Sequence, residues 1–503
     1  MTRGLHAALA ALLLTACAVG PDFQRPAAPS VDGYTPEPPA DPAATTRVTA
    51  GTAQHFASGQ DLPGDWWTLF HSDTLDALVK RGLANNPDTE AAQAALRQAQ
   101  ETMYAGQGAL FPTVSASFQP ERELLSGAEF GTPKAHPTFS LVTAQLSVAY
   151  APDVFGGTRR QIESLAAQAE YQRYELEATY LTLTSNIVVA AITEASLRGQ
   201  IEATEQIIKA EQDQLSVVRA QLAAGGASLA DVLTQEAQLA QTRSSLPPLR
   251  KQLAQARDQL VALLGGFPNE DLGVQFILSD LQLPEDLPVS LPSQLVEQRP
   301  DVRAAEAQFH AASANLGVAI ANQLPQFNIS AAIGTASPGF TNFLNPVSGI
   351  WSIAGGVTQT LFDAGALLHK KRAAAAALDQ AAAQYRSTVV KAFQNVADTL
   401  RALQLDAETL REQAAAERAS RASLALARDQ YAVGAISYLT LLNADRTWQQ
   451  ARISLVRAEA ARLSDTAALF QALGGGWWHR EDVLTAKNGP DRLTAPVVSA
   501  LQP

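Results

Sequence analysis

The histidines and the cysteine that could support nucleophilic or metal chemistry are few and scattered, and the plentiful acidic residues of the long helices lie among Arg, Lys and Gln as a solvated face. The chain has 503 residues with a single cysteine, Cys17, close to its N-terminus, so no cysteine–histidine pair for nucleophilic catalysis can be built from it. No two histidines have the His-x-x-x-His spacing that sets two metal ligands on one helical face. We therefore expect no catalytic residue, no metal site and no bound cofactor. The histidines are His6, His55, His71, His136, His310, His369 and His479.

Cys17 fits an anchoring chemistry instead. A basic start with Arg3, an apolar stretch over residues 5–14 and small residues before Cys17 form the pattern of a secretory signal peptide. The stretch is shorter than the ~20 apolar residues that a spanning helix needs. Residues 14–17 resemble the bacterial lipobox, so we expect residues 1–16 to be removed and Cys17 to carry a covalent lipid. Ala18 in place of an aspartate favours sorting to the outer membrane, and a plain signal peptide with an incidental cysteine is the alternative.

The charge balance excludes one large class of partner. The chain carries 37 basic and 49 acidic residues, so its net charge is −12, and no basic run is present. A nucleic-acid binder needs such a run to displace counterions from phosphates, so we expect no nucleic acid. Only 17% of the residues are charged and 47% are hydrophobic, which predicts surfaces that meet protein partners or lipid.

The chain is an internal duplication. Residues 86–92 match residues 299–305, which lie 213 positions later, and an offset of 209 maps Gly225 onto Gly434 and Ser228 onto Ser437. We expect structured sequence to begin at Asp65, after an extended proline-rich segment. The predicted divisions are a signal peptide at 1–16, a lipid-anchored proline-rich segment at 17–64, a first repeat at 65–266, a linker at 267–292, a second repeat at 293–476 and a C-terminal tail at 477–503.

Each repeat contains very long helices that fold back as hairpins. In the first repeat apolar residues such as Tyr180, Ile187 and Ile201 fall on one seven-residue step, the signature of a coiled-coil seam. No proline interrupts residues 157–224, so at 1.5 Å per residue the helix reaches ~100 Å. Glycines with the following Ser228 or Ser437 predict a helix end and a new helix start. We expect Pro247-Pro248 to break the returning helix of the first repeat with a kink, at a point where the second repeat, which lacks these prolines, should differ.

Between these helices the apolar period changes to two. Residues 113–118, 143–150, 327–333 and 351–357 alternate apolar and polar side chains, which predicts strands with two unlike faces. From the sequence we expect no helix apolar enough to span a bilayer, which leaves a closed barrel as the membrane structure. About four strands cannot close a barrel, so several copies must contribute, and the spacing does not say how many.

The chain resembles the TolC-like outer-membrane factors of the lipoprotein (NodT-type) branch. The segments that carry the resemblance are residues 17–26, 66–70, 298–303, 361–365 and 431–444. The resemblance implies a mainly α protein with membrane β structure, in which a trimer forms a twelve-stranded β-barrel continuous with a twelve-helix coiled-coil periplasmic tunnel. It also implies location in the outer membrane of a Gram-negative bacterium, in contact with lipid.

The resemblance further implies the exit duct of a tripartite efflux pump. Such a duct passively conducts drugs, metals or other small molecules, with a periplasmic adaptor (membrane fusion) protein and an inner-membrane pump of the resistance–nodulation–division class as partners. A duct for type I protein secretion is one alternative. A lipid-anchored periplasmic coiled-coil adaptor is another, but an adaptor needs no strands with a lipid-facing side.

Two groups of residues become candidate sites under this interpretation. The first is the pair of hairpin tips expected to meet the adaptor, made of Gly225, Gly226, Ala227, Ser228, Val433, Gly434, Ala435 and Ile436. The second is a constriction just after the tips, made of Leu439, Thr440, Asn443 and Asp231. Asp231 also stands three residues after Ser228, where it would simply cap its helix.

Overall fold

The computed structural model describes residues 18–126 and 138–480, so Cys17, the predicted signal peptide and the tail beyond residue 480 lie outside the described residues. The chain forms two compact units. Of the described residues, the strand-bearing unit comprises 18–26, 95–126, 138–173 and 304–386. The hairpin-bearing unit comprises 27–94, 174–303 and 387–480. Both repeats contribute to both units, so the duplication is interleaved.

The elements repeat in the same order. The first repeat contains α2 (Asp73–Asn85), α3 (Pro87–Gln107), β2 (Thr113–Leu124), β3 (Thr138–Tyr150), α4 (Gly157–Ala223) and α5 (Leu229–Leu263). The second contains α6 (Pro292–Gln298), α7 (Pro300–Ala321), β5 (Gln326–Ser337), β6 (Gly349–Thr358), α8 (Ala366–Ala432) and α9 (Tyr438–Ala472). Helices α4 and α8 each have 67 residues, and α5 and α9 each have 35. The predicted duplication and long hairpins are confirmed.

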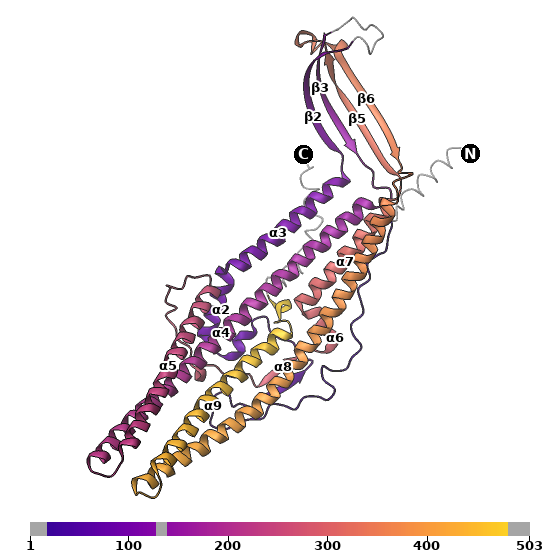
Figure 1. The fold of residues 1–503 in the computed structure, drawn as a ribbon. Coiled ribbons are helices and arrows are strands. Elements are labelled where there is room, and N and C mark those ends of the chain that lie inside the picture. Colours follow the sequence, from indigo (N-terminus) through magenta and orange to yellow (C-terminus); the bar gives the residue numbers. More distant parts are fainter. Residues whose placement is uncertain (1–17, 127–137, 481–503) are drawn as a thin grey trace. The chain divides into compact units, whose positions relative to one another are not determined.

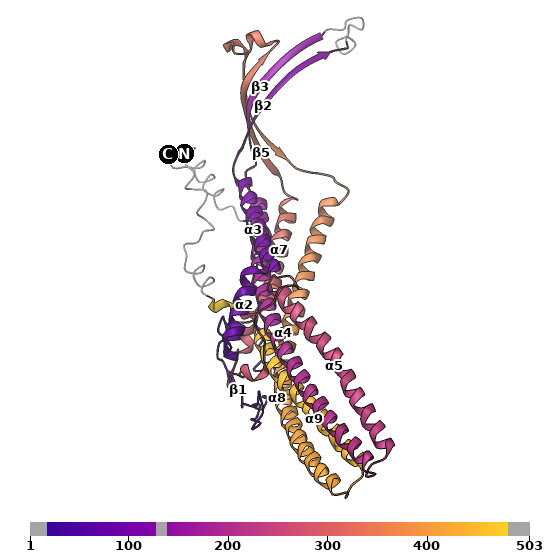
Figure 2. The same cartoon turned by 90° about the vertical axis from the view of Figure 1, so that its left-hand side faces the viewer.

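Four antiparallel strands of the strand-bearing unit form one sheet in the order β2-β3-β5-β6, the curved sheet of Figures 1 and 2. Directly paired residues share a face. One row across all four strands is apolar, and it consists of Ala116, Leu146, Ile333 and Trp351. The neighbouring row lies on the other face of the sheet and has small, mostly polar side chains. It consists of Ser115, Ser147, Ala332 and Ser352. The predicted alternation is therefore a property of the whole sheet.

The apolar face has no cover within the described chain. Ile333 is 65% exposed and Trp351 is 80% exposed, far more than core side chains of that size tolerate in water. Strands β2 and β6 are the edges of the sheet, and within the described residues each pairs on one side only. An apolar face and two open edges are what a sheet shows when further copies and lipid complete it.

In the hairpin-bearing unit the helices pair as α4 with α5 and α8 with α9 (Figures 1 and 2). The two hairpins pack on each other through buried side chains that include Leu215, Val218, Leu424 and Leu441. Helix α5 continues through Pro247-Pro248, and the kink predicted at these prolines stays a prediction. Their rings remove two backbone donors, but they hold φ near the helical value, so the helix does not end there.

The proline-rich N-terminal segment is folded earlier than predicted. Strand β1 (His55–Ser58) pairs in parallel with β4 (Asp286–Val289), so structure begins before Asp65 and continues into the predicted linker. Arg462 on α9, fully buried, donates from its guanidinium to the carbonyl oxygens of Ala50 at 3.0 Å and Thr52 at 2.7 Å. Proline prevents a helix here, but the segment is still held in place, because the Arg462 guanidinium satisfies two of its backbone carbonyls.

One expectation about the helices was also wrong. Among the described residues one helix, α4, contains an 18-residue window that is apolar and charge-poor enough to cross a membrane by length and composition. Of that window 56% is buried inside the protein. Its apolar side chains, such as Ile187 and Ile192, lie in the core of the hairpin-bearing unit, so the composition of α4 has a packing explanation.

The two faces of the sheet predict opposite responses to charge. Ile333→Arg on the apolar face should cost about 2–4 kcal/mol in a bilayer and reduce assembled oligomer in membrane extracts. The matched control is Ser330→Arg, which lies on the polar face three residues earlier in β5 and should assemble normally. Semi-native gel electrophoresis of membrane extracts measures both. Equal assembly of the two variants would contradict the lipid-facing assignment.

Candidate functional site: the hairpin turns and the buried link between them

Both hairpins end in the same backbone turn. In the first, Gly225 takes φ +77° and the amide of Gly226 donates back to the carbonyl of Gln221 at 2.8 Å. In the second, Gly434 takes φ +75° and the amide of Ala435 makes the equivalent bond at 2.8 Å. A left-handed glycine followed by this backward bond is a standard helix stop. The turns are therefore fixed in shape by their own backbones.

The predicted tip residues differ in what they present. Val433 is 79% exposed, and Ala435 is exposed as well. Ala227 and Ile436 instead pack against the apolar cluster between the two hairpins. The outward surface of the tips is thus supplied mainly by the glycines and by Val433 and Ala435.

Asp231 has a local structural role in the first hairpin. Its amide donates to the Ser228 hydroxyl at 3.2 Å, while the Ser228 amide donates to the Asp231 carboxylate at 2.9 Å. This reciprocal pair is a capping box. The hydroxyl and the amide of Ser228 lower the pKa of the Asp231 carboxyl, because both bonds favour the ionised form. In the second hairpin, Thr440 takes the equivalent place after Ser437.

The other predicted constriction residues lie on the open face of α9. Leu439 is 60% exposed, and Thr440 and Asn443 are exposed as well. Leu439 and Asn443 lie one helical turn apart on the same side of α9. The residue before Leu439 is Tyr438, which is buried, with 7% of its surface exposed. The sequence did not single it out.

Tyr438 links the two hairpins. Its hydroxyl donates to the side-chain oxygen of Gln235 on α5, and its ring lies 5.6 Å from the ring of Tyr431. The Tyr431 hydroxyl in turn donates to the side chain of Gln221 on α4 at 2.9 Å. Burial raises the pKa of the Tyr438 hydroxyl, so it stays protonated and remains a donor.

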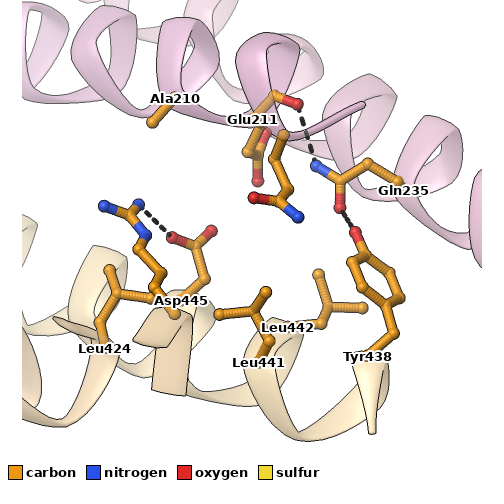
Figure 3. Close-up of a pocket in the computed structure, with 10 residues that line it drawn as sticks. Ala210, Glu211, Gln235, Leu424, Tyr438, Leu441, Leu442 and Asp445 are labelled. Carbon is orange, nitrogen blue, oxygen red and sulfur yellow. Dashed lines mark hydrogen bonds and ion pairs between the residues drawn. The ribbon is translucent and has the colours of Figure 1, made fainter. Parts of the chain in front are cut away.

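Glu211 on α4 is the centre of a buried polar cluster next to this link (Figure 3). Its backbone carbonyl accepts from Gln235 at 3.1 Å. One carboxylate oxygen accepts from Gln238 at 3.1 Å, from Thr242 at 3.0 Å and from Gln449 of α9 at 2.9 Å. The other carboxylate oxygen is buried without a partner among the described residues. One buried charge therefore joins both hairpins through neutral donors.

A second carboxylate shares this cluster. Asp445 on α9 lies 3.8 Å from the Arg428 guanidinium of α8 and accepts from the Gln449 amide. Burial, followed by the nearby charge of Glu211, raises the pKa of Asp445 to about 6. A heptad reading assigns Gln, Glu and Asp to the solvent, which is why the sequence did not reveal this cluster. Polar residues on the apolar seam, such as Gln235 and Gln238, were the available signal.

A separate cluster lies in the strand-bearing unit, where residues 18–26 contact α4 and α7. We call this segment the clasp. Asp22 accepts from the Arg160 guanidinium at 2.5 Å, and Arg25 pairs with Glu306 at 3.0 Å. The Phe23 ring stacks on His310 with 4.4 Å between ring centroids. The clasp holds the chain that follows Cys17 against folded helices.

Other segments that carry the resemblance make hydrogen bonds at the ends of helices. The Asp363 carboxylate accepts from the amides of Gly365 at 2.9 Å and Leu367 at 2.7 Å, which caps the start of α8. Arg299 donates to the carbonyl of Ala472 at 2.8 Å, at the end of α9. These residues organise helix ends, and no catalytic chemistry follows from their contacts.

The buried carboxylates predict a pH-dependent stability. Because the folded pKa of Asp445 lies above that of an unfolded aspartate, ionisation of Asp445 opposes folding, and this penalty grows as the pH rises from about 4 to above 6. Asp445→Asn should therefore raise stability at pH 7.5 by about 1–3 kcal/mol and change little at pH 4. Thermal melting at both pH values measures this effect. The exposed Asp429→Asn on α8 is the control, and an equal gain at both pH values would contradict the explanation.

Known proteins match over nearly the whole chain. The outer membrane protein OpmQ of Pseudomonas aeruginosa, described as a pyoverdine export protein, is 31% identical over 452 residues, or 86% of this chain and 93% of OpmQ. The probable efflux pump outer membrane protein TtgC of Pseudomonas putida is 29% identical over 95% of this chain and 97% of its own. The solved outer-membrane channel OprN superposes with a TM-score of 0.82 at 26% identity, covering 92% of this chain and all of OprN.

The family profile described as outer membrane efflux protein matches residues 78–266 and 291–475, the two repeats. The fold resemblance stated from the sequence is confirmed, and the protein lies in the outer membrane as the exit channel of a tripartite efflux system. The profile covers both repeats, and OpmQ is similar over most of the chain. The chain therefore belongs to the outer membrane efflux protein family.

Proposed function

We propose that this channel is a homotrimer, lipid-anchored through Cys17, which conducts small molecules passively from a periplasmic adaptor and an inner-membrane pump of the resistance–nodulation–division class. The observation that supports the stoichiometry is the four-stranded sheet with two open edges, since the twelve-stranded barrel that the family resemblance implies needs three copies of it. The clasp supports the anchor, because it holds residue 18 against folded helices. Mass spectrometry of the mature N-terminus tests the anchor, and an unmodified residue 17 would overturn it.

The descriptions of the relatives bear on what the channel conducts. OpmQ is described as a pyoverdine exporter and TtgC as a probable efflux pump component, while the relative CusC of Escherichia coli belongs to a cation efflux system. Relatives at similar identity thus carry different cargo descriptions. We infer that drugs, metals or other small molecules are selected by the pump, and that the channel is not an enzyme. A role in type I protein secretion is the alternative, which co-purification of the partner pump would resolve.

The exposed tips are the proposed adaptor contact. Val433→Glu and Ala435→Glu should leave the trimer intact, because both side chains are exposed, yet reduce export at least tenfold by placing charges in the contact. The matched control is Val390→Glu, since Val390 is 67% exposed on α8 outside the tips. Export is measured in cells that rely on this channel, together with cross-linking to the adaptor. Normal export and cross-linking in the tip variants would show that the contact lies elsewhere.

The start of α9 is the proposed constriction. Leu439→Ala should raise the resting conductance of the purified trimer, because truncating three exposed leucines widens a narrow entrance. Asp231→Asn should lower cation selectivity, since a ring of three carboxylates attracts cations in proportion to its charge. Planar-bilayer recording measures both properties, with Leu426→Ala, a 59% exposed leucine of α8, as the control. Unchanged conductance and selectivity would leave Asp231 as a helix cap only.

A further inference from the structure

The strand-bearing unit contains a hollow of about 430 Å³ that no part of the proposed mechanism uses. All four helices of the unit line it, with Ala99 from α3, Gln168 from α4, Gln308 from α7 and Gln380 from α8. Because all four helices contribute to its lining, the hollow lies on one face of the wall that they form. Its volume falls within the range of sites that hold small molecules.

The lining is rich in carboxamides and contains no charge. Of its twelve residues none is acidic or basic, and the polar side chains are Gln168, Tyr171, Gln172, Gln308, Asn315, Gln380 and Gln384, with alanines between them. Each carboxamide offers two donors and an acceptor. The side chains of Gln172, Gln308, Asn315 and Gln380 make no hydrogen bond to another described residue and are therefore available to a solute.

The hollow faces away from the clasp. On α7 the clasp contacts Glu306 through Arg25, and Gly20 lies directly on Gly317. At 3.6 residues per turn, Gln308 and Asn315 lie about 200° around α7 from those two positions. The clasp leads to residue 17, whose lipid would enter the surrounding bilayer, so its side of α7 is the outside of the channel. The hollow is then on the lumen side.

We propose that this hollow is a contact site in the lumen for uncharged solutes rich in amide or hydroxyl groups. The proposal rests on the channel function and specifies a class of cargo that the wall itself favours. An ion entering the hollow loses hydration without meeting an opposite charge, whereas an amide exchanges its water hydrogen bonds for carboxamide ones. Three chains would place three such sites around the duct.

The experiment compares probes of one backbone and three charges. N-acetyl-triglycinamide is neutral, N-acetyl-triglycine is an anion and triglycinamide is a cation at pH 7. Binding to the detergent-purified trimer is titrated by ligand-observed NMR, which does not depend on conduction. We expect the neutral probe to bind most tightly. The double variant Gln308→Leu with Gln380→Leu should weaken it at least about threefold, since each lost hydrogen bond contributes modestly. Gln100→Leu, an exposed glutamine of α3 outside the hollow, should not.

A second variant keeps size and polarity. Gln308→Glu with Gln380→Glu should reverse the preference, so that the cationic probe binds most tightly. Equal binding of the three probes, or neutral-probe binding unchanged in both double variants, overturns the proposal. If the unaltered trimer bound the neutral probe but showed neither conductance nor export, the channel function would fail instead, so the two failures are distinguishable.

Discussion

The backbone of the outer strands sets the central constraint. Strands β2 and β6 each carry a row of donors and acceptors that the described chain does not satisfy, beside a face of Leu146, Ile333 and Trp351. In hydrocarbon every such group costs several kcal/mol, so a single copy cannot remain in the bilayer. Assembly is therefore a condition of membrane residence. The duplication supplies two hairpins of strands per chain, which reduces the number of copies that closure needs.

The buried cluster shows how the duplication has diverged. At the offset of 209, Tyr438 corresponds to Leu229, which is 61% exposed, and Gln449 corresponds to Ala240. Glu211 corresponds to Ser420. The hydrogen-bonded link therefore has no counterpart on its other side, although the backbones of the two hairpins are equivalent. The two hairpins therefore have similar backbones but different side-chain contacts, since the contacts of Tyr438, Gln449 and Glu211 are not repeated at the equivalent positions.

The sequence predicted those parts of the fold that depend on local rules. Glycines in left-handed turns, serine caps and the two apolar periods are short-range signals, so the hairpins at Gly225 and Gly434 and the strands could be predicted. The folding of residues 45–58 could not, because it depends on Arg462, more than 400 positions away. Pro247-Pro248 show the same limit of local rules, since α5 continues through both prolines. Of the candidate sites, tip and constriction residues could be located, but Tyr438 and Glu211 could not, because a periodic pattern treats polar residues as solvated.

The equal lengths of the paired helices have a consequence for how this protein can evolve. With 67 residues in both α4 and α8, and 35 in both α5 and α9, the two turns end level within the hairpin-bearing unit. Adding seven residues to one arm would preserve its seam but leave its hairpin unbalanced, since the returning arm would have to grow as well. The neighbouring hairpin would then need the same extension to keep its turn beside the first. Length changes in this family should thus accumulate as matched insertions in four places, and a lineage with a wider gap to its inner-membrane partner would show them in all four arms together.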